Sequence, residues 1–447
     1  MMRYLFVFIV MFLVFSSCDN SSEQSNVNST LVEAQVVAKL SSDDVQQILL
    51  SAQTLSQSVQ SQALPVFGIT VFEVIYKTKD EKGNLIEVSG LVAYPDVKSV
   101  SSPVNPDFKS PIISDQHGTI FLNNEAPTVA FKNDINTLVS GNIPPDYQFS
   151  TTFQLVIQYT ALLGLTSVFP DYIGYGKSVD HFHTYMLEES LANSVIDLIL
   201  ASIELAKTFQ IPVKKDVYLA GYSEGGYSTM AAAKKLQENN RGLNVKGVYP
   251  MGGVYNLEVM GLGIVSSEYM SFPPFPAYVA YSYGETYDNI SLQLLVNDEF
   301  VDLLPSLFDK TKDSLYIYGA MFNAIGKDPQ NDIFIPSDLF RPEVIVNFIE
   351  DENNPFRTDL RMNNVDDWVP SFNMTIFHCS GDDILPYNLA FQTYQKFINS
   401  GAKNVNMINP EEVFGTLPLT HTECAYKAYP LMINLVCNSE YGFDCIN

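Results

Sequence analysis

Residues 217–230 read Val-Tyr-Leu-Ala-Gly-Tyr-Ser-Glu-Gly-Gly-Tyr-Ser-Thr-Met, and this stretch decides the fold class. The run 217–220 is short and apolar, with β-branched and aromatic residues, as in a buried strand. The segment 228–236 predicts a helix of small residues. The Gly-x-Ser-x-Gly motif between them, centred on Ser223, takes its meaning from this strand–turn–helix context. We expect a turn so tight that side chains at Gly221 and Gly225 would collide with neighbouring elements, with Ser223 strained at the top of the sheet. An ordinary glycine-rich turn is the alternative, because the bare motif also occurs by chance.

The composition is that of a large globular protein with an acidic balance. Of 447 residues, 46% are hydrophobic and 17% are charged, which suits one big α/β domain with insertions or two domains. The formal charge of −25 argues against nucleic acid as a partner, because such a chain cannot replace phosphate counterions. The same charge is compatible with an exported, soluble surface.

The N-terminus predicts export. Arg3 gives a positive start, residues 4–15 are apolar, and residues 16–18 are small and end in Cys18. The apolar run has the length of a signal-peptide core and is too short to span a membrane. The segment up to Cys18 resembles a bacterial lipobox, which implies that residues 1–17 are removed and Cys18 is lipidated. We expect a bacterial lipoprotein anchored on the periplasmic or cell-surface side, with residues 18–30 as a flexible tether. A plain secretory peptide with an incidental cysteine is the alternative.

Four further cysteines allow two disulfides in an exported protein: Cys379, Cys424, Cys437 and Cys445. Cys437 and Cys445 flank a short loop, so we expect that pair first. Cys379 and Cys424 would then pair or remain as buried thiols. The spacing is wrong for a zinc site, and we predict neither a metal nor an organic cofactor.

Strands that alternate with helices predict a mostly parallel sheet with helices on both faces. Residues 31–62 have apolar positions at roughly helical spacing and predict one or two short surface helices. Residues 66–77 and 85–94 predict a hairpin around a turn cluster. Further strands are expected at 112–113, 165–169, 217–220, 245–249, 374–378 and 405–408. Further helices are expected at 189–209, 228–236, 389–397 and after residue 422.

The segment 253–370 interrupts this alternation. It is rich in Tyr, Phe, Pro and Met, and its later half has a helical pattern. Because it follows the strand after the Ser223 turn, it is well placed to fold over the site as a cap, with an extra packing layer as the alternative. We therefore expect residues 31–252 and 371–447 to form the two parts of one α/β core.

A serine nucleophile needs a histidine as its base, and the base follows it in the chain order expected for this fold. Downstream of Ser223 the histidines are His378 and His421. His421 lies in a loop between the last strand and the last helix, where the base is expected. His378 lies inside a predicted strand and is interpreted as structural.

The carboxylate that orients the base is expected in residues 381–386, Gly-Asp-Asp-Ile-Leu-Pro. The acid usually lies four residues before the proline of such a loop, which selects Asp382 and leaves Asp383 as the second candidate. A helix cap or an Asx turn is the alternative for both, because aspartates serve these purposes routinely.

Two backbone N–H groups are needed to bind the oxyanion of an acyl-transfer intermediate. One is the N–H of Glu224, directly after the serine. The other belongs to the loop 114–119, where Gly118 lets the backbone approach closely, so that Gly118 or Thr119 is the donor. His117 in the same loop precedes the nucleophile and is interpreted as scaffolding.

Together these motifs resemble the α/β-hydrolase superfamily, and within it the secretory lipase and esterase branch. The resemblance rests on 116–119 (Gln-His-Gly-Thr), 169–176 (Phe-Pro-Asp-Tyr-Ile-Gly-Tyr-Gly), 221–226, 381–386 and His421. It covers the chain from residue 67 onward, with 253–370 corresponding in position only.

The resemblance implies an α/β-hydrolase fold with a sheet of about eight strands and an insertion that acts as a lid. It implies Ser223 as nucleophile, Asp382 as orienting acid and His421 as base. Glu224 departs from the family pattern, since its side chain adds a negative charge near the oxyanion. His181 and His183, in the loop after 169–176, are expected to pack rather than react.

The sequence thus predicts a serine hydrolase that cleaves carboxylic esters through an acyl-enzyme, as lipases and carboxylesterases do. The aromatic, Met-containing insertion favours a small-molecule ester with an apolar acyl or aryl group. The alternatives are a serine peptidase of the prolyl-oligopeptidase type, an esterase of glycan side chains, and a lipid-anchored binding protein on a catalytically dead scaffold. Too few residues precede the 114–119 loop for the β-propeller that such peptidases usually carry.

Overall fold

A computed structural model describes residues 29–51, 65–144 and 146–446 of the chain. The predicted signal peptide, Cys18 and most of the predicted tether lie outside the described residues, as does the segment 52–62. At the end of the predicted tether, Ser29 and Thr30 donate hydrogen bonds to the carboxylate of Glu204 at 2.6 and 3.0 Å.

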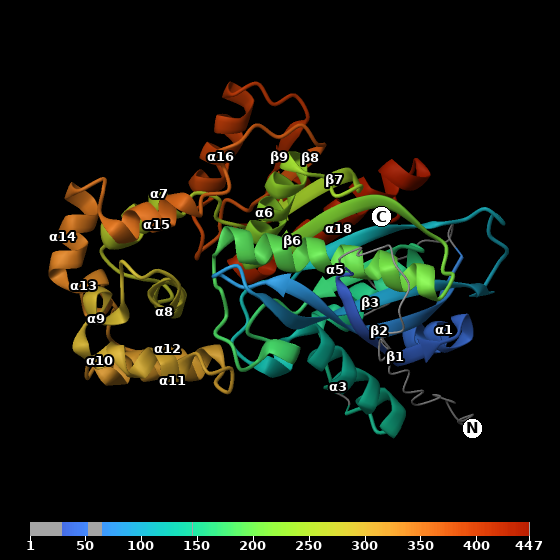
Figure 1. The fold of residues 1–447 in the computed structure, drawn as a ribbon, viewed down its shortest axis with the longest axis horizontal. Coiled ribbons are helices and arrows are strands. Elements are labelled where there is room, and N and C mark those ends of the chain that lie inside the picture. The colour runs from blue at the N-terminus through green and yellow to red at the C-terminus, as the bar shows by residue number, and fades with distance from the viewer. Residues whose placement is uncertain (1–28, 52–64, 145, 447) are drawn as a thin grey trace, which may run out of the picture.

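A nine-stranded sheet forms the centre of the described chain (Figure 1). Its spatial order is β1-β2-β3-β5-β4-β6-β7-β8-β9. Neighbouring strands from β1 to β5 pair antiparallel, and those from β5 to β9 pair parallel. The strands are β1 (Leu31–Leu40), β2 (Phe67–Lys79), β3 (Leu85–Val100), β4 (Ser110–Gln116), β5 (Thr166–Pro170), β6 (Val213–Tyr222), β7 (Asn244–Met251), β8 (Met374–Phe377) and β9 (Val405–Ile408). The predicted mostly parallel sheet is confirmed.

Helices pack on both faces of the sheet, as predicted. Along β6, Val217 and Leu219 belong to one buried cluster, while Tyr218 and Ala220 belong to the other, because successive side chains of a strand point to opposite faces. The first cluster includes α5 (Glu188–Thr208) and α6 (Glu224–Glu238). The other helices of the core are α1 (Ser42–Ser51), α3 (Pro127–Ser140), α4 (Thr151–Val156) with η2 (Ile157–Leu162), α16 (Tyr387–Asn399), α17 (Pro410–Phe414) and α18 (His421–Tyr441), with short turns η1 (Asn123–Glu125) and η3 (Gly176–Ser178).

The prediction of helix for residues 31–40 was wrong, because this segment is strand β1. It pairs antiparallel with β2, with Ala34 opposite Val74 and Leu40 opposite Ile69. Apolar residues at 34, 36, 38 and 40 alternate with polar ones at 33, 35 and 39, which is the period of a strand, and Val37 disguises that alternation. This strand makes the sheet nine-stranded rather than about eight-stranded. The helical part of the prediction is confirmed at α1.

A long helical insertion separates β7 from β8 and forms a lobe to one side of the sheet (Figure 1, yellow to orange). The helical pattern predicted for its later half is confirmed. Its helices are α7 (Leu257–Val265), α8 (Pro274–Thr286), α9 (Leu292–Leu295), α10 (Asp298–Val301), α11 (Leu303–Leu307), α12 (Ser314–Ala324), α13 (Pro336–Leu339), α14 (Pro342–Glu350) and α15 (Pro355–Met362).

The turn between β6 and α6 is as tight as its sequence predicts. Ser223 adopts φ 62° and ψ −120°, in a region that L-residues with side chains rarely occupy. A Cβ atom at Gly225 would lie 1.9 Å from the carbonyl oxygen of Gln116, and one at Gly221 would lie 2.5 Å from that of Gly225. These contacts are with backbone atoms, which cannot rotate away. Glycine is therefore required at both positions.

Gly225→Ala is expected to destabilise the fold by about 3 kcal/mol or more, since the new methyl group overlaps the backbone of β4. The matched control is Gly319→Ala in α12, where a Cβ atom meets nothing within 4 Å. That variant is expected to be neutral or more stable by up to about 1 kcal/mol, because alanine favours helix. Urea unfolding of both variants measures the difference, and equal stabilities would contradict the packing described for the turn.

Candidate active site

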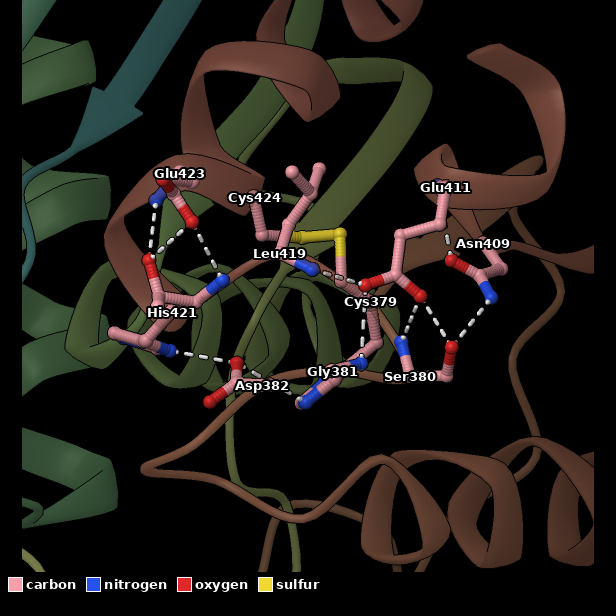
Figure 2. Close-up of a disulfide and its surroundings, with 12 residues drawn as sticks. Cys379, Ser380, Gly381, Asp382, Asn409, Glu411, Leu419, His421, Glu423 and Cys424 are labelled. Atoms are coloured by element: carbon pink, nitrogen blue, oxygen red, sulfur yellow. Dashed lines mark hydrogen bonds and ion pairs between the residues drawn. A yellow bond between two sulfur atoms is a disulfide. The ribbon is translucent and has the colours of Figure 1, made fainter. Parts of the chain in front are cut away.

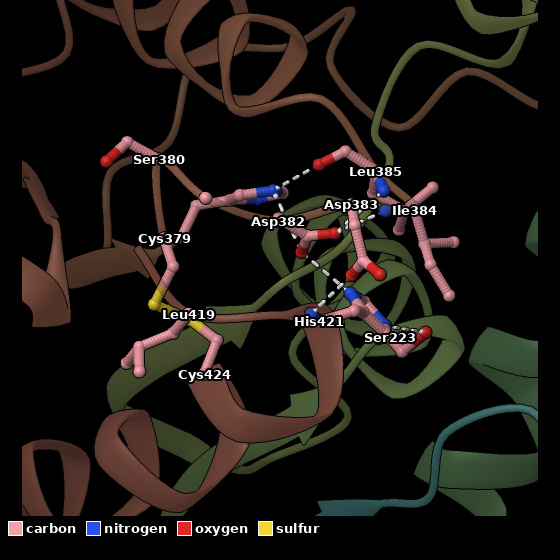
Figure 3. A network of polar contacts seen from close by, with 12 residues as sticks. Ser223, Cys379, Ser380, Asp382, Asp383, Ile384, Leu385, Leu419, His421 and Cys424 are labelled. Atoms are coloured by element: carbon pink, nitrogen blue, oxygen red, sulfur yellow. Dashed lines mark hydrogen bonds and ion pairs between the residues drawn. A yellow bond between two sulfur atoms is a disulfide. The ribbon is translucent and has the colours of Figure 1, made fainter. Parts of the chain in front are cut away.

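Three side chains from separate parts of the chain form a hydrogen-bonded series (Figure 3). The Oγ of Ser223 lies 2.9 Å from Nε2 of His421, and Nδ1 of His421 lies 2.7 Å from Oδ2 of Asp382. Ser223 is the residue between β6 and α6, Asp382 lies in the loop after β8, and His421 is the first residue of α18. The structure therefore brings together the three residues selected in the sequence, in the order serine, aspartate, histidine.

The protonation of this series follows from what each group can donate. Burial tends to raise the pKa of Asp382, but the hydrogen bond and charge of His421 outweigh it, so the pKa lies below its ordinary value. The ionised carboxylate only accepts, so Nδ1 of His421 carries the proton that it donates to Asp382. In the neutral imidazole, Nε2 is then a free acceptor for the hydroxyl proton of Ser223, which is the tautomer that a general base needs.

The loop that carries Asp382, residues 379–386 and called the acid loop below, is stabilised by hydrogen bonds to its own backbone. The second carboxylate oxygen of Asp382, Oδ1, accepts hydrogen bonds from the backbone N–H groups of Ile384 and Leu385 at 3.0 and 2.8 Å. The buried His378 donates from Nε2 to the carbonyl oxygen of Leu385 at 2.8 Å, and the same nitrogen lies 3.4 Å from Asp382. Burial lowers the pKa of His378, which keeps the ring neutral. His378 thus contacts the acid loop, while the hydrogen-bonded partner of Ser223 is His421.

Asp383 holds the backbone of His421 rather than its ring. Its Oδ1 accepts the backbone N–H of His421 at 2.9 Å. From the other side, the hydroxyl of Tyr222 donates to the carbonyl oxygen of His421 at 2.6 Å. Thr420 caps the helix, and Glu423 completes a capping box with it. The ring of His421 therefore projects from a fixed helix start.

A disulfide and one glutamate connect the loop of Asp382 to the start of α18, where His421 lies (Figure 2). Cys379 is bonded to Cys424, so one end lies just before Asp382 and the other lies within the first turn of α18. The carboxylate of Glu411 accepts the backbone N–H of Gly381 at 3.0 Å and that of Leu419 at 2.6 Å. It also accepts from both the N–H and the hydroxyl of Ser380. One buried carboxylate thus joins the loop before Asp382 to the loop before His421.

The second disulfide, Cys437–Cys445, confirms the pair expected from the sequence. Chain entropy predicts that the Cys379–Cys424 link stabilises the fold more, by about 4 kcal/mol against about 2.5 kcal/mol. The reason is that it closes the longer loop, with a sequence separation of 45 residues against 8. The more stabilising of the two links is therefore the one beside the site.

The segment 117–120 lies against the turn at Ser223. A Cβ atom at Gly118 would lie 3.1 Å from the carbonyl oxygen of Tyr222 and 3.5 Å from Cβ of Ser223, so the two backbones approach closely there. The N–H groups of Gly118 and Thr119 donate no hydrogen bond to the described residues. The N–H of Glu224 belongs to the first turn of α6, whose N–H groups have no partner within the helix. These groups are available to a ligand.

The remaining histidines have no hydrogen bond to Ser223 among the described residues. His117 approaches two carbonyl oxygens, with Nδ1 2.7 Å from that of Gly118. His181 is exposed. His183 is buried and its Nε2 lies 2.7 Å from Oε1 of Glu224. The side chain of Glu224 therefore points into the protein and pairs with a histidine that we expected to pack only.

A cavity of about 330 Å³ opens beside Ser223. Side chains of the insertion and of the loop before α16 line it, and none of the lining residues is charged. Representative lining residues are Met260, Ile264, Phe272, Phe275, Val279 and Leu389. The residues around this space therefore suit an apolar group better than a charged one.

Two searches of the described residues complete the description. No group of three or more His, Cys, Asp or Glu side chains there has the arrangement of a metal site. Among the described helices, none has both the length and the hydropathy needed to cross a membrane.

Several contributors to this geometry could not be found in the sequence. Glu411 follows an Asn-Pro pair that predicts only a helix start, and its contact with the acid loop depends on the position of β9 beside β8. The His183–Glu224 pair joins residues 41 positions apart. The sequence signals it only through a glutamate directly after the serine and a histidine, 41 positions earlier, that has no assigned role.

The chain belongs to the secretory lipase family, whose model matches residues 148–422, more than half of its length. Membership of this family identifies a hydrolase of the lipase and esterase kind and indicates export. No curated protein sequence matches the chain significantly.

Solved structures of a hydrolase, an esterase and a lipase have a similar fold. A "putative hydrolase" from Legionella pneumophila superposes with a TM-score of 0.73 at 24% identity, covering 92% of this chain and 98% of that one. The rice cell wall degrading esterase LipA from Xanthomonas oryzae gives 0.69 at 20% identity, with 93% and 98% covered. Candida antarctica lipase A in its closed state gives 0.61 at 15% identity, with 94% and 84% covered. The predicted α/β-hydrolase fold is confirmed.

Proposed function

We propose that this member of the secretory lipase family is a serine esterase that hydrolyses carboxylic esters through an acyl-enzyme intermediate. The observation that carries the proposal is the series Ser223–His421–Asp382, with both hydrogen bonds at 2.9 Å or less, at the edge of an uncharged cavity. A buried base with a free Nε2 and an oriented hydroxyl is what nucleophilic attack on a carbonyl requires.

In the first half of the reaction, Oγ of Ser223 attacks the ester carbonyl while Nε2 of His421 takes the hydroxyl proton. The ionised Asp382 stabilises the imidazolium that forms. The intermediate collapses, His421 gives its proton to the leaving alkoxide, and the acyl group remains on Ser223. Water then attacks the acyl-enzyme by the same route, which releases the acid and restores the serine.

The negative oxygen of the tetrahedral intermediate is stabilised by backbone N–H groups. We assign this role to the N–H of Glu224 and to that of Gly118 or Thr119. The close approach of Gly118 to the Ser223 turn and the lack of other acceptors for these groups among the described residues support the assignment. One such donor typically contributes about 10²-fold or more to the rate.

The cavity favours a substrate with an apolar acyl or aryl group. A dipeptide would bring charged termini that need charged partners, and none of the lining side chains carries a charge. Because α7 and α8 contribute many of the lining residues, we propose that residues 253–370 act as the cap that encloses the acyl group.

We further propose that the protein is a lipoprotein held on the membrane through Cys18. Support comes from the sequence, where Arg3, an apolar run at 4–15 and small residues precede Cys18. Such an anchor would keep the enzyme on the exported side of the membrane, and membership of a secretory family agrees with export. A single mass measurement of the mature N-terminus separates this proposal from a plain secretory peptide.

Hydrolysis of p-nitrophenyl esters of increasing acyl length tests the proposed activity. Turnover is expected to rise from the acetate toward medium chains as the acyl group fills the cavity. Ser223→Ala is expected to lower kcat by about 10³-fold or more, since it removes the nucleophile. Turnover confined to acetate would favour a small-acyl or glycan side-chain esterase. Turnover that persists in Ser223→Ala would contradict the mechanism, and activity on dipeptide amides alone would favour a peptidase.

Replacement of each aspartate in turn distinguishes the two candidates for the acid. Asp382→Asn is expected to lower kcat by about 10⁴-fold, because the amide favours the wrong tautomer of His421. Asp383→Asn is the matched control and is expected to cost less than about tenfold, since an amide oxygen can still accept the backbone N–H of His421. Steady-state kinetics on one ester measures both, and a larger loss in Asp383→Asn would reverse the assignment.

A further inference from the structure

A carboxylate that directly follows the nucleophile is buried with a histidine. The side chains of Glu224 and His183 are 0% and 1% exposed, and Oε1 of Glu224 lies 2.7 Å from Nε2 of His183. Nδ1 of His183 lies 2.8 Å from the carbonyl oxygen of Ile173. The second carboxylate oxygen of Glu224 has no hydrogen-bond partner among the described residues. Among the residues that the structure describes, His183 is therefore the one polar side chain that hydrogen-bonds this carboxyl group.

The number of protons in this pair can be counted from its geometry. A carbonyl oxygen can only accept, so Nδ1 of His183 carries a proton. Nε2 lies at hydrogen-bonding distance from a carboxyl oxygen, so one further proton lies between them. The pair is then either an imidazolium with a carboxylate or an imidazole with a carboxylic acid. In both cases its net charge is zero.

Neutrality matters because of where the pair lies. In the proposed function, the N–H of Glu224 donates a hydrogen bond to the negative oxygen of the intermediate. An unpaired carboxylate on the same residue would repel that oxygen, and a buried site screens the repulsion poorly. The negative charge that the sequence predicts for Glu224 is thus balanced by His183.

His183 also lies within a group of tyrosines that hydrogen-bond the segment 117–120, which carries the second set of oxyanion donors. The rings of Tyr172, Tyr175 and Tyr185 lie with their centroids 6.0, 5.0 and 5.8 Å from that of His183. Tyr175 donates to the carbonyl oxygen of Ile120 at 2.5 Å. In addition, the hydroxyl of Tyr172 donates to the carbonyl oxygen of His117 at 3.3 Å, and that of Tyr185 lies 2.9 Å from Oγ1 of Thr119.

The ring of His183 is therefore linked to both parts of the oxyanion site. It hydrogen-bonds the side chain of Glu224, and it packs against tyrosines whose hydroxyls hydrogen-bond residues 117, 119 and 120.

We propose that His183 is a positioning residue for the esterase reaction. It balances the charge of Glu224, and it keeps the N–H of Glu224 and the N–H groups of residues 118–119 in place around the negative oxygen. The proposal rests on the proposed function, because it concerns the same intermediate. It assigns His183 an effect on the transition state that simple packing of a loop would not have.

The test is a double-mutant cycle with kcat and KM measured on one p-nitrophenyl ester. His183→Ala leaves the carboxylate of Glu224 unpaired and is expected to lower kcat by at least about tenfold, with KM changed less than about threefold. Glu224→Gln is expected to cost less, since an amide can donate to the neutral Nε2 of His183. The double variant is expected to be at least about threefold faster than His183→Ala, because its buried side chain carries no charge.

The control is His181→Ala, which removes an exposed histidine from the same loop and is expected to leave kcat unchanged. A kcat in His183→Ala equal to that of the wild type would overturn the proposal. A double variant no faster than His183→Ala would also overturn it, since the loss would then come from packing.

Thermal unfolding of the same variants separates this proposal from the proposed function. His183→Ala is expected to unfold at a lower temperature, and Glu224→Gln in the same chain to restore part of the loss, whether or not the protein is an esterase. A wild type without Ser223-dependent turnover would overturn the proposed function and the catalytic part of this inference. An unfolding cycle without restoration would overturn the charge pairing itself.

Discussion

The site depends on one imidazole being held between two partners from distant parts of the chain. His421 lies 2.9 Å from the hydroxyl of Ser223 and 2.7 Å from the carboxylate of Asp382, although 198 and 39 residues separate it from them. An error of about 1 Å in any of the three positions would break a hydrogen bond and cost about 10²-fold in rate. The surrounding structure therefore fixes each partner separately. A glycine turn against β4 fixes the serine, and backbone N–H groups fix the aspartate. A capped helix start, linked to the acid loop by a disulfide and by Glu411, fixes the histidine.

Burial of charge is the second constraint, and three acids near the site meet it through hydrogen-bonding partners. Asp382 is bound by an imidazole and two backbone N–H groups. Burial tends to raise the pKa of Glu411, but hydrogen bonds from the hydroxyl of Ser380 and from the backbone of two loops together lower it. Glu224 is paired with His183. Although the formal charge of the chain is −25, none of the residues that line the cavity beside Ser223 is charged.

The sequence predicts those features that depend on neighbouring residues. The tight turn at Ser223 follows from two glycines within five residues, and Asp382 follows from its distance to a proline in the same loop.

Prediction from the sequence fails where a feature depends on the final packing. Residues 31–40 show the period of a strand, but they become one only because β2 offers an edge to pair with. The pairing of Glu224 with His183 and the contact of Glu411 with two loops depend on the fold as a whole, so neither residue carries a local signal of its partner. His378 is predicted to be structural from an expected strand, but β8 ends at Phe377 and His378 follows it directly. Its hydrogen bond to Leu385 in the loop of Asp382 carries no local signal in the sequence.

The central claim is that Ser223 is the nucleophile, and covalent labelling tests it most directly. A p-nitrophenyl alkylphosphonate transfers its phosphonyl group to an activated serine, with loss of p-nitrophenolate, and the product resembles the tetrahedral intermediate. The account predicts one phosphonyl group per chain, on the peptide that contains Ser223 when the digested protein is analysed by mass spectrometry, with esterase activity lost in proportion to labelling. Complete labelling of Ser223 with activity retained, or inactivation through a label on another residue, would contradict it.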